Sequence, residues 1–141
     1  MLGFRYERNR NERNITYYAS TNENRKRLID ELMEDYSGVV IVGGEGAKEL
    51  WTNADAIRLV QEAAAAGKSI GAWGEAVGVL ASADVVSEVK LTGPACCTEA
   101  LQKAGAKVST RQIESSGNFV TGYDSTVGMR FGKALAQAVS V

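Results

Sequence analysis

KSIGAWGEAVGVL, residues 68–80, is the stretch of this sequence that decides its fold. Residues 70–73 predict a short buried strand, Gly74 and Glu75 a tight turn, and the residues from Ala76 onward a helix. A strand that turns directly into a helix is how an α/β sheet presents a nucleophile at its carboxyl edge. Here the apex of the corner is Gly74-Glu75, so the corner is predicted without a nucleophilic side chain.

Length and charge place the chain among ordinary globular proteins. Its 141 residues are enough for one domain with its own core. A formal net charge of −1 favours neither nucleic acid nor a membrane surface as a partner. The sequence has no apolar run long enough to span a bilayer, and residues 1–5 do not resemble a signal peptide, so we expect a cytoplasmic protein.

The titratable residues exclude several chemistries. The chain contains no histidine, which removes catalytic triads, Cys-His dyads and histidine-bound zinc. Its two cysteines, Cys96 and Cys97, are adjacent, so a disulfide between them would close a small strained ring. We expect reduced thiols near a helix start, with a redox-sensing pair as the alternative, and we expect no metal and no cofactor.

Before the corner, the pattern predicts a polar N-terminal arm, residues 1–13, followed by a single domain, residues 14–141. The arm carries alternating Arg and Glu side chains without an apolar period. The expected elements are a strand at 14–19, a helix at 20–35, a strand at 39–42 buried on both faces, a short helical turn at 48–51 and a helix at 54–65 packing through Ile57, Leu59, Val60 and Ala64.

After the corner, the expected elements are a strand-like segment at 85–91, a helix at 98–103, a strand at 107–114, a turn at 115–118 and a returning strand at 119–121. A last helix is expected at 127–139, with Val127, Phe131, Leu135 and Ala138 on its apolar face. Strands alternate with helices through most of the chain. This order predicts an α/β fold, flavodoxin-like or Rossmann-like: a doubly wound, mostly parallel sheet with a late β-hairpin.

Ligands of such sheets bind beyond the carboxyl ends of the strands. Two glycine-rich corners are expected there, and both have an acidic residue. The candidate ligand-binding residues are therefore Gly43, Gly44, Glu45, Gly74 and Glu75, and the candidate catalytic residues are Glu75 and Glu45. A simple turn, or a favourable interaction of Glu75 with a helix dipole, explains the same residues without a ligand.

Four segments in this order resemble the ThiJ/PfpI family, within the class I glutamine amidotransferase-like superfamily. The segments are Val39-Val40-Ile41-Val42-Gly43-Gly44, Gly67-Lys68-Ser69-Ile70-Gly71-Ala72, Leu91-Thr92-Gly93 with Ala104-Gly105-Ala106, and Gly117-Asn118-Phe119-Val120-Thr121-Gly122 with Phe131-Gly132-Lys133-Ala134-Leu135. The resemblance covers roughly residues 35–140. Residues 55–63 and 72–75 look most like the nucleophile-free C-terminal domain of large-subunit catalases.

The resemblance implies that the family's nucleophilic cysteine falls on Gly74 and its following histidine on Glu75. It also implies that the Gly43-Gly44 backbone corner is the part that helps to form an oxyanion hole in the family. The family's protease, deglycase and amidotransferase chemistries use that cysteine, so the departure at Gly74 argues against each of them.

The sequence therefore favours a non-catalytic ThiJ/PfpI-like domain that acts as a binding or assembly module. Members of the family commonly dimerise, so a homodimer is expected, with a small-molecule ligand as a possible further partner. The first alternative is an enzyme with altered chemistry that uses Glu75 and Glu45 as a carboxylate pair. The second is a phosphate or nucleotide site at residues 43–46, which the acid Glu45 disfavours.

Overall fold

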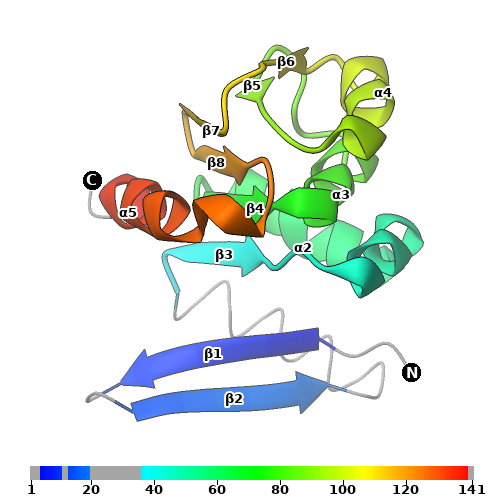
Figure 1. The fold of residues 1–141 in the computed structure, drawn as a ribbon. Coiled ribbons are helices and arrows are strands. Elements are labelled where there is room, and N and C mark those ends of the chain that lie inside the picture. The colour runs from blue at the N-terminus through cyan, green and yellow to red at the C-terminus, as the bar shows by residue number, and fades with distance from the viewer. Residues whose placement is uncertain (1–3, 11–12, 20–35, 140–141) are drawn as a thin grey trace. The chain divides into compact units, whose positions relative to one another are not determined.

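The computed structural model describes residues 4–10, 13–19 and 36–139 (Figure 1). Its contacts divide the chain into two compact units, Met1–Asp35 and Tyr36–Val141. The helix expected at 20–35 lies outside the described residues.

The first unit contains an antiparallel pair of strands, β1 (Phe4–Arg10) and β2 (Arg13–Ala19). Their register pairs Phe4 with Ala19 and Arg10 with Arg13. The strand predicted at 14–19 is confirmed. Residues 4–10, expected as part of a polar N-terminal arm, form its partner strand.

The second unit is built around a four-stranded sheet. The sheet consists of β3 (Gly38–Ile41), β4 (Ser69–Trp73), β7 (Ile113–Ser116) and β8 (Phe119–Gly122), in the order β3-β4-β8-β7. The first three strands of that order run parallel, whereas β7 pairs antiparallel with β8 as the late hairpin. The predicted α/β, flavodoxin-like fold with a mostly parallel sheet is confirmed.

Helices cover both faces of this sheet. A Cβ added to Gly71 in β4 would lie 3.0 Å from Cζ of Phe131, so α5 (Gly128–Val139) packs directly against that glycine. Side chains alternate along a strand, so the fully buried Ile70 and Ala72 face the opposite side, where α2 (Ala54–Ala65) contacts β4. Figure 1 shows α5, in red, beside β7, β8 and β4.

The apolar face predicted for the last helix is confirmed. Val127 and Phe131 are buried with Val120 of β8, and Leu135 and Ala138 pack against this cluster. A short 3-10 turn, Ser125–Val127, precedes the helix because the Asp124 carboxylate accepts the backbone N–H of Thr126.

The face predicted for α2 is rotated from the observed one. Ala56, Leu59, Val60 and Ala63 are the buried residues, whereas Ile57 and Ala64 are only partly covered. Asn53 caps the helix as its position predicts, because its Oδ1 accepts the N–H groups of Asp55 and Ala56.

The continuous strand predicted at 107–114 is wrong. Residues 107–108 form β6 (Lys107–Val108), which pairs in parallel with β5 (Lys90–Leu91), and β7 begins only at Ile113. Between them the chain bends, because the Thr92 hydroxyl donates to the carbonyl of Arg111 at 2.5 Å and the Ser109 Oγ accepts the N–H of Arg111. The expected turn at 115–118 is likewise shorter, since β7 extends to Ser116.

The burial predicted for residues 39–42 is also wrong. β3 lies at an edge of the four-stranded sheet, and 40% of Val40 and 62% of Val42 remain exposed. A short apolar run is consistent with a buried strand but does not specify the order of strands in the sheet, so it cannot distinguish an interior strand from an edge strand.

Candidate functional site

The predicted strand-turn-helix corner is present. β4 ends at Trp73, a 3-10 turn spans Gly74–Ala76, and α3 (Val77–Ser82) follows without a loop. Gly74 is buried and has a φ of +63°, a left-handed conformation that glycine adopts without strain. A Cβ added there would lie 3.7 Å from Cα of Gly43, so the apex has room for a side chain but carries none.

The structure brings the two glycine corners together. Gly43, just beyond β3, lies against the end of β4: a Cβ added to it would stand 2.4 Å from the carbonyl oxygen of Trp73. Gly44 has a φ of +139° and begins a 3-10 helix, Glu45–Thr52, in which its carbonyl accepts the N–H of Ala47 at 3.0 Å. The sequence predicted that both corners lie at the carboxyl edge of the sheet, and the close approach of Gly43 to β4 requires glycine at that position.

Trp51, which the sequence did not mark as a site residue, packs against the corner. It stands near the end of the 3-10 helix, and its Nε1 donates to the backbone oxygen of Glu75 at 2.7 Å. A Cβ added to Gly78 in α3 would lie 2.1 Å from the indole ring, so the ring rests directly on the helix backbone. No sequence pattern signals this contact, because its two partners lie in different elements.

Cys97 reaches the same corner from α4 (Ala95–Lys103). Its Sγ lies 3.9 Å from the carbonyl oxygen of Gly74 and 3.8 Å from that of Glu75. The residue is fully buried, and burial, followed by the neighbouring Cys96, raises the pKa of its thiol from 9.0 to about 12. The thiol nearest the apex is therefore protonated at neutral pH. Sequence spacing gave no sign of this position.

The two candidate carboxylates differ in what the structure describes. Glu75 is half-buried within the turn, and its backbone oxygen faces both Trp51 and Cys97. The side chain of Glu45 lies outside the described part of the chain, so the proposed carboxylate pair stays a prediction. Within residues 36–139 as described, no three His, Cys, Asp or Glu side chains gather as a metal ion requires.

A second polar cluster joins β5 to the hairpin. The backbone N–H of Thr92 donates to Oγ1 of Thr121 at 2.9 Å, and both threonines are buried. Glu114, only 4% exposed, accepts a hydrogen bond of 2.7 Å from Ser109, and Lys90 lies 3.9 Å from the same carboxylate oxygen. Each buried polar group named here has a partner, which is typical of a structural cluster.

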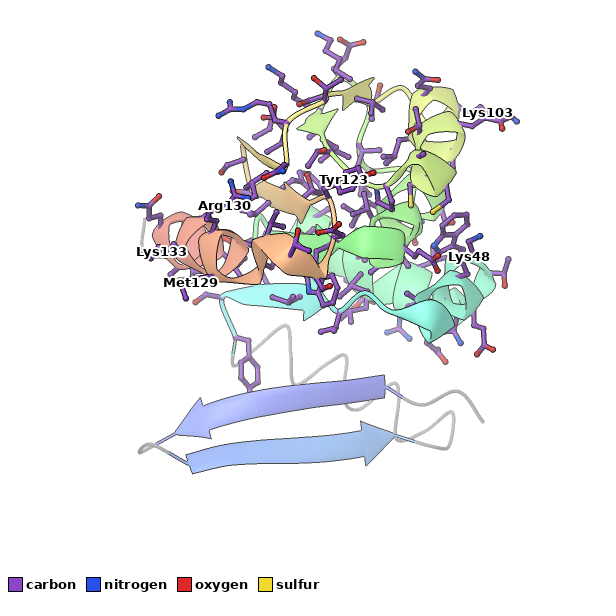
Figure 2. All side chains as sticks on the ribbon, viewed as in Figure 1. Lys48, Lys103, Tyr123, Met129, Arg130 and Lys133 are labelled. Carbon is purple, nitrogen blue, oxygen red and sulfur yellow. The ribbon has the colours of Figure 1, made fainter. Side chains whose placement is uncertain are left out.

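The outer surface of α5 is partly apolar. Met129 is 80% exposed, and Figure 2 shows it on the helix with Arg130 and Lys133. None of the described helices is long and apolar enough to cross a membrane.

The described features are those of an α/β protein with a flavodoxin-like fold: a mostly parallel sheet, a strand-turn-helix corner of the kind that carries nucleophiles, and a glycine pair beside its apex. Residues 19–138 match the model of the DJ-1/PfpI family. The chain belongs to that family.

Relatives of known sequence or structure agree with this assignment. An uncharacterized protein of Methanocaldococcus jannaschii, MJ0967, is 36% identical over 118 residues, which cover 81% of this chain and 57% of the relative. The chain thus spans little more than half the length of that protein.

Solved structures share the fold. A ThiJ/PfpI domain protein from Brachyspira murdochii has a TM-score of 0.76 at 21% identity, covering 90% of this chain and 70% of its own. A mutant of DJ-1 from Schizosaccharomyces pombe has a TM-score of 0.72 at 23% identity, and the match covers 92% of this chain and 69% of the DJ-1 chain. A two-domain protein from Anabaena variabilis, with DJ-1/ThiJ/PfpI-like and ferritin-like domains, has a TM-score of 0.72 at 25% identity. That match covers 77% of this chain and 32% of the two-domain protein.

Proposed function

We propose that this chain is a divergent, non-catalytic DJ-1/PfpI-family domain that acts as a binding or assembly module. The observation that carries the proposal is the apex of the corner, where Gly74 offers backbone only and faces the backbone of Gly43. Chemistry at a nucleophile corner requires a side chain that attacks the substrate and a base that activates it. Gly74 provides no attacking group, and the chain has no histidine.

The nearest thiol does not replace the missing nucleophile. Cys97 is buried behind the turn rather than exposed at its apex, and its Sγ faces the carbonyls of Gly74 and Glu75. Its raised pKa keeps it protonated at neutral pH, whereas a nucleophilic cysteine needs a lowered one. The resemblance that residues 55–63 and 72–75 suggest, to the nucleophile-free C-terminal domain of large-subunit catalases, is consistent with the same proposal.

The proposed ligand-binding face is the double corner formed by Gly43, Gly44, Glu45, Gly74 and Glu75. Glycines allow a ligand to approach backbone N–H groups closely, and the carboxyl edge of a parallel sheet is where such folds bind ligands. The acidic residues favour a small molecule with hydrogen-bond donors over a phosphate, because an acid in the loop repels an anion.

The proposed assembly face is the edge of β3 with which no other described strand of the second unit pairs, and the proposed partner is a second copy of this chain. The carbonyl of Ser37 accepts the N–H of Ser69, so the backbone groups of Val39 and Ile41 also point toward β4. Backbone groups alternate along a strand, so those of Gly38 and Val40 point to the open edge among the described strands. An exposed edge with apolar side chains pairs readily with another strand.

Activity assays on three proteins test the non-catalytic proposal. Wild type, Gly74→Cys and Gly67→Cys are compared for peptide hydrolysis, for glutamine hydrolysis and for consumption of a reactive dicarbonyl such as methylglyoxal. Gly67 is a matched control, because it also has a positive φ, +70°, and no atom within 4 Å of an added Cβ. We expect no turnover by wild type or Gly67→Cys. Gain of turnover by Gly74→Cys alone would identify the missing thiol as the cause.

Turnover by the wild-type protein would contradict the proposal. If that turnover were lost in Glu75→Gln, the alternative of an enzyme that uses the Glu75 carboxylate would be supported instead. The conservative variant keeps the size of the side chain and removes only its charge.

A further inference from the structure

Two adjacent thiols stand at the start of α4 and differ sharply in environment. Cys96 is exposed and Cys97 is buried, yet their Sγ atoms lie only 3.9 Å apart. Proposed binding and assembly at the glycine corner and the β3 edge do not involve either thiol.

The buried thiol of Cys97 and the indole of Trp51 contact the same atom of the corner. Cys97 lies 3.8 Å from the backbone oxygen of Glu75, the same atom that accepts the hydrogen bond from Trp51. The second of the two tryptophans, Trp73, immediately precedes Gly74. A movement of Cys97 therefore changes the surroundings of the Trp51 indole, which donates to the same oxygen.

We propose that Cys96 and Cys97 form a reversible vicinal disulfide, and that its formation withdraws the Cys97 sulfur from the carbonyls of Gly74 and Glu75. The pair would then act as a redox-sensitive switch, because oxidation removes a buried contact with the turn that forms the corner.

Geometry explains why this bond would be a switch rather than a permanent link. Successive side chains on a helix point about 100° apart, whereas a disulfide requires its Cβ atoms within about 4.5 Å of each other. The first turn of α4 must therefore rearrange, including the bond from the N–H of Cys97 to the carbonyl of Pro94 at 2.9 Å. A strained disulfide is more easily reduced than a structural one, which makes it labile.

The oxidant is a low-molecular-weight disulfide. The exposed Cys96 thiolate attacks one sulfur of the oxidant, forms a mixed disulfide and releases the first thiolate. Cys97 then loses its proton and attacks the sulfur of Cys96, forming the protein disulfide and releasing the second thiol. Two protein thiols are oxidised and one small disulfide is reduced to two thiols.

The order of the two steps follows from the environments. Burial raises the pKa of the Cys97 thiol to about 12, and the neighbouring Cys96 contributes to that rise, so Cys97 is the resolving thiol rather than the attacking one. Once Cys96 is in the mixed disulfide, it carries no negative charge, and the repulsion that opposes ionisation of Cys97 disappears.

The test uses the full chain in buffers of oxidised and reduced glutathione. Intact mass, free-thiol count and tryptophan emission are followed together for wild type, Cys96→Ser and Cys97→Ser. For wild type we expect a monomeric species lighter by two hydrogens, with both thiols lost and a shifted tryptophan emission, all reversed by dithiothreitol. Cys97→Ser should stop at the glutathione adduct on Cys96 and keep the emission of the reduced protein.

Three results would overturn the proposal. One is a wild-type protein that accumulates only the glutathione adduct, and another is a disulfide that joins two chains. The third is an internal disulfide that leaves tryptophan emission unchanged. If Cys97→Ser fails to fold, Cys96→Ser still decides the matter, because it keeps the buried thiol and must show neither mass loss nor emission shift.

Discussion

Trp51 and Glu75 are joined by a hydrogen bond of 2.7 Å from the indole Nε1 to the backbone oxygen, across 24 positions of the chain. This bond fastens the 3-10 helix that follows the first glycine corner onto the turn that forms the second. The indole ring also rests on Gly78, so the same residue fixes both the turn and the helix after it.

Gly78→Ala should destabilise the protein by about 1–3 kcal/mol, as overpacking a well-filled core does. The reason is that the added Cβ would stand 2.1 Å from Cε2 of Trp51. Gly132→Ala is the matched control, since it lies in α5 with no atom within 4 Å of an added Cβ. Its stability should rise by roughly 0.5–1 kcal/mol. Urea denaturation measures both, and equal changes would refute the packing of Trp51 on α3.

Alanine at the two corner glycines should have unequal costs. Gly43→Ala places its Cβ 2.4 Å from a backbone oxygen, which cannot move aside without disturbing β4. Gly74→Ala meets nothing closer than 3.7 Å and pays only for its left-handed backbone, about 1–2 kcal/mol. Gly46→Ala, with open space around it, serves as the control. In thermal unfolding, Gly43→Ala should lose most; a larger loss in Gly74→Ala would contradict the described geometry.

Cys97 should make the stability of the fold fall in alkaline solution. Its folded-state pKa of about 12 lies above the ordinary 9.0, so the folded protein holds this proton more tightly than the unfolded chain. The stabilisation is complete below pH 9.0 and declines between pH 9.0 and about 12, by up to about 1.4 kcal/mol per pH unit. Denaturation of wild type and Cys97→Ala at pH 8 and pH 10 checks the sign. An equal decline in both proteins would show that another group is responsible.

Glu114 should matter more to stability than the lysine beside it. Glu114→Ala removes the acceptor for the Ser109 hydroxyl and should cost about 1–3 kcal/mol. Lys90→Ala should cost less than about 1 kcal/mol, because Lys90 is 58% exposed and 3.9 Å from the carboxylate. Urea denaturation of the two variants compares them. If Lys90→Ala were the more harmful, the cluster would depend on charge rather than on its hydrogen bond.

Local pattern was sufficient for the main elements of the second unit. The corner at Gly74, the hairpin strand at 119–121 and the apolar face of the last helix, with Phe131 at its centre, each follow from neighbouring residues. Each is also the kind of feature in which local preference and tertiary packing agree.

Long-range contacts decided what the sequence could not predict. Thr92 bends the chain after β6 through a hydroxyl that lies 19 positions from Arg111, so a strand-like run became two short strands. β3 is an edge strand because of the sheet order, which the composition of residues 39–42 does not encode. Trp51 and Cys97 meet Gly74 and Glu75 only through the folding of separate elements, which is why neither was predicted at the candidate site.

Native mass spectrometry over a range of protein concentrations tests the central claim, that this domain is an assembly module, most directly. We predict a dimer without added mass for wild type and a monomer for Val40→Lys. Val139→Lys is the control, since Val139 is also 40% exposed, and it should remain dimeric. A wild-type protein that stays monomeric at every concentration, or a dimer that survives Val40→Lys intact, would contradict assembly through the edge of β3.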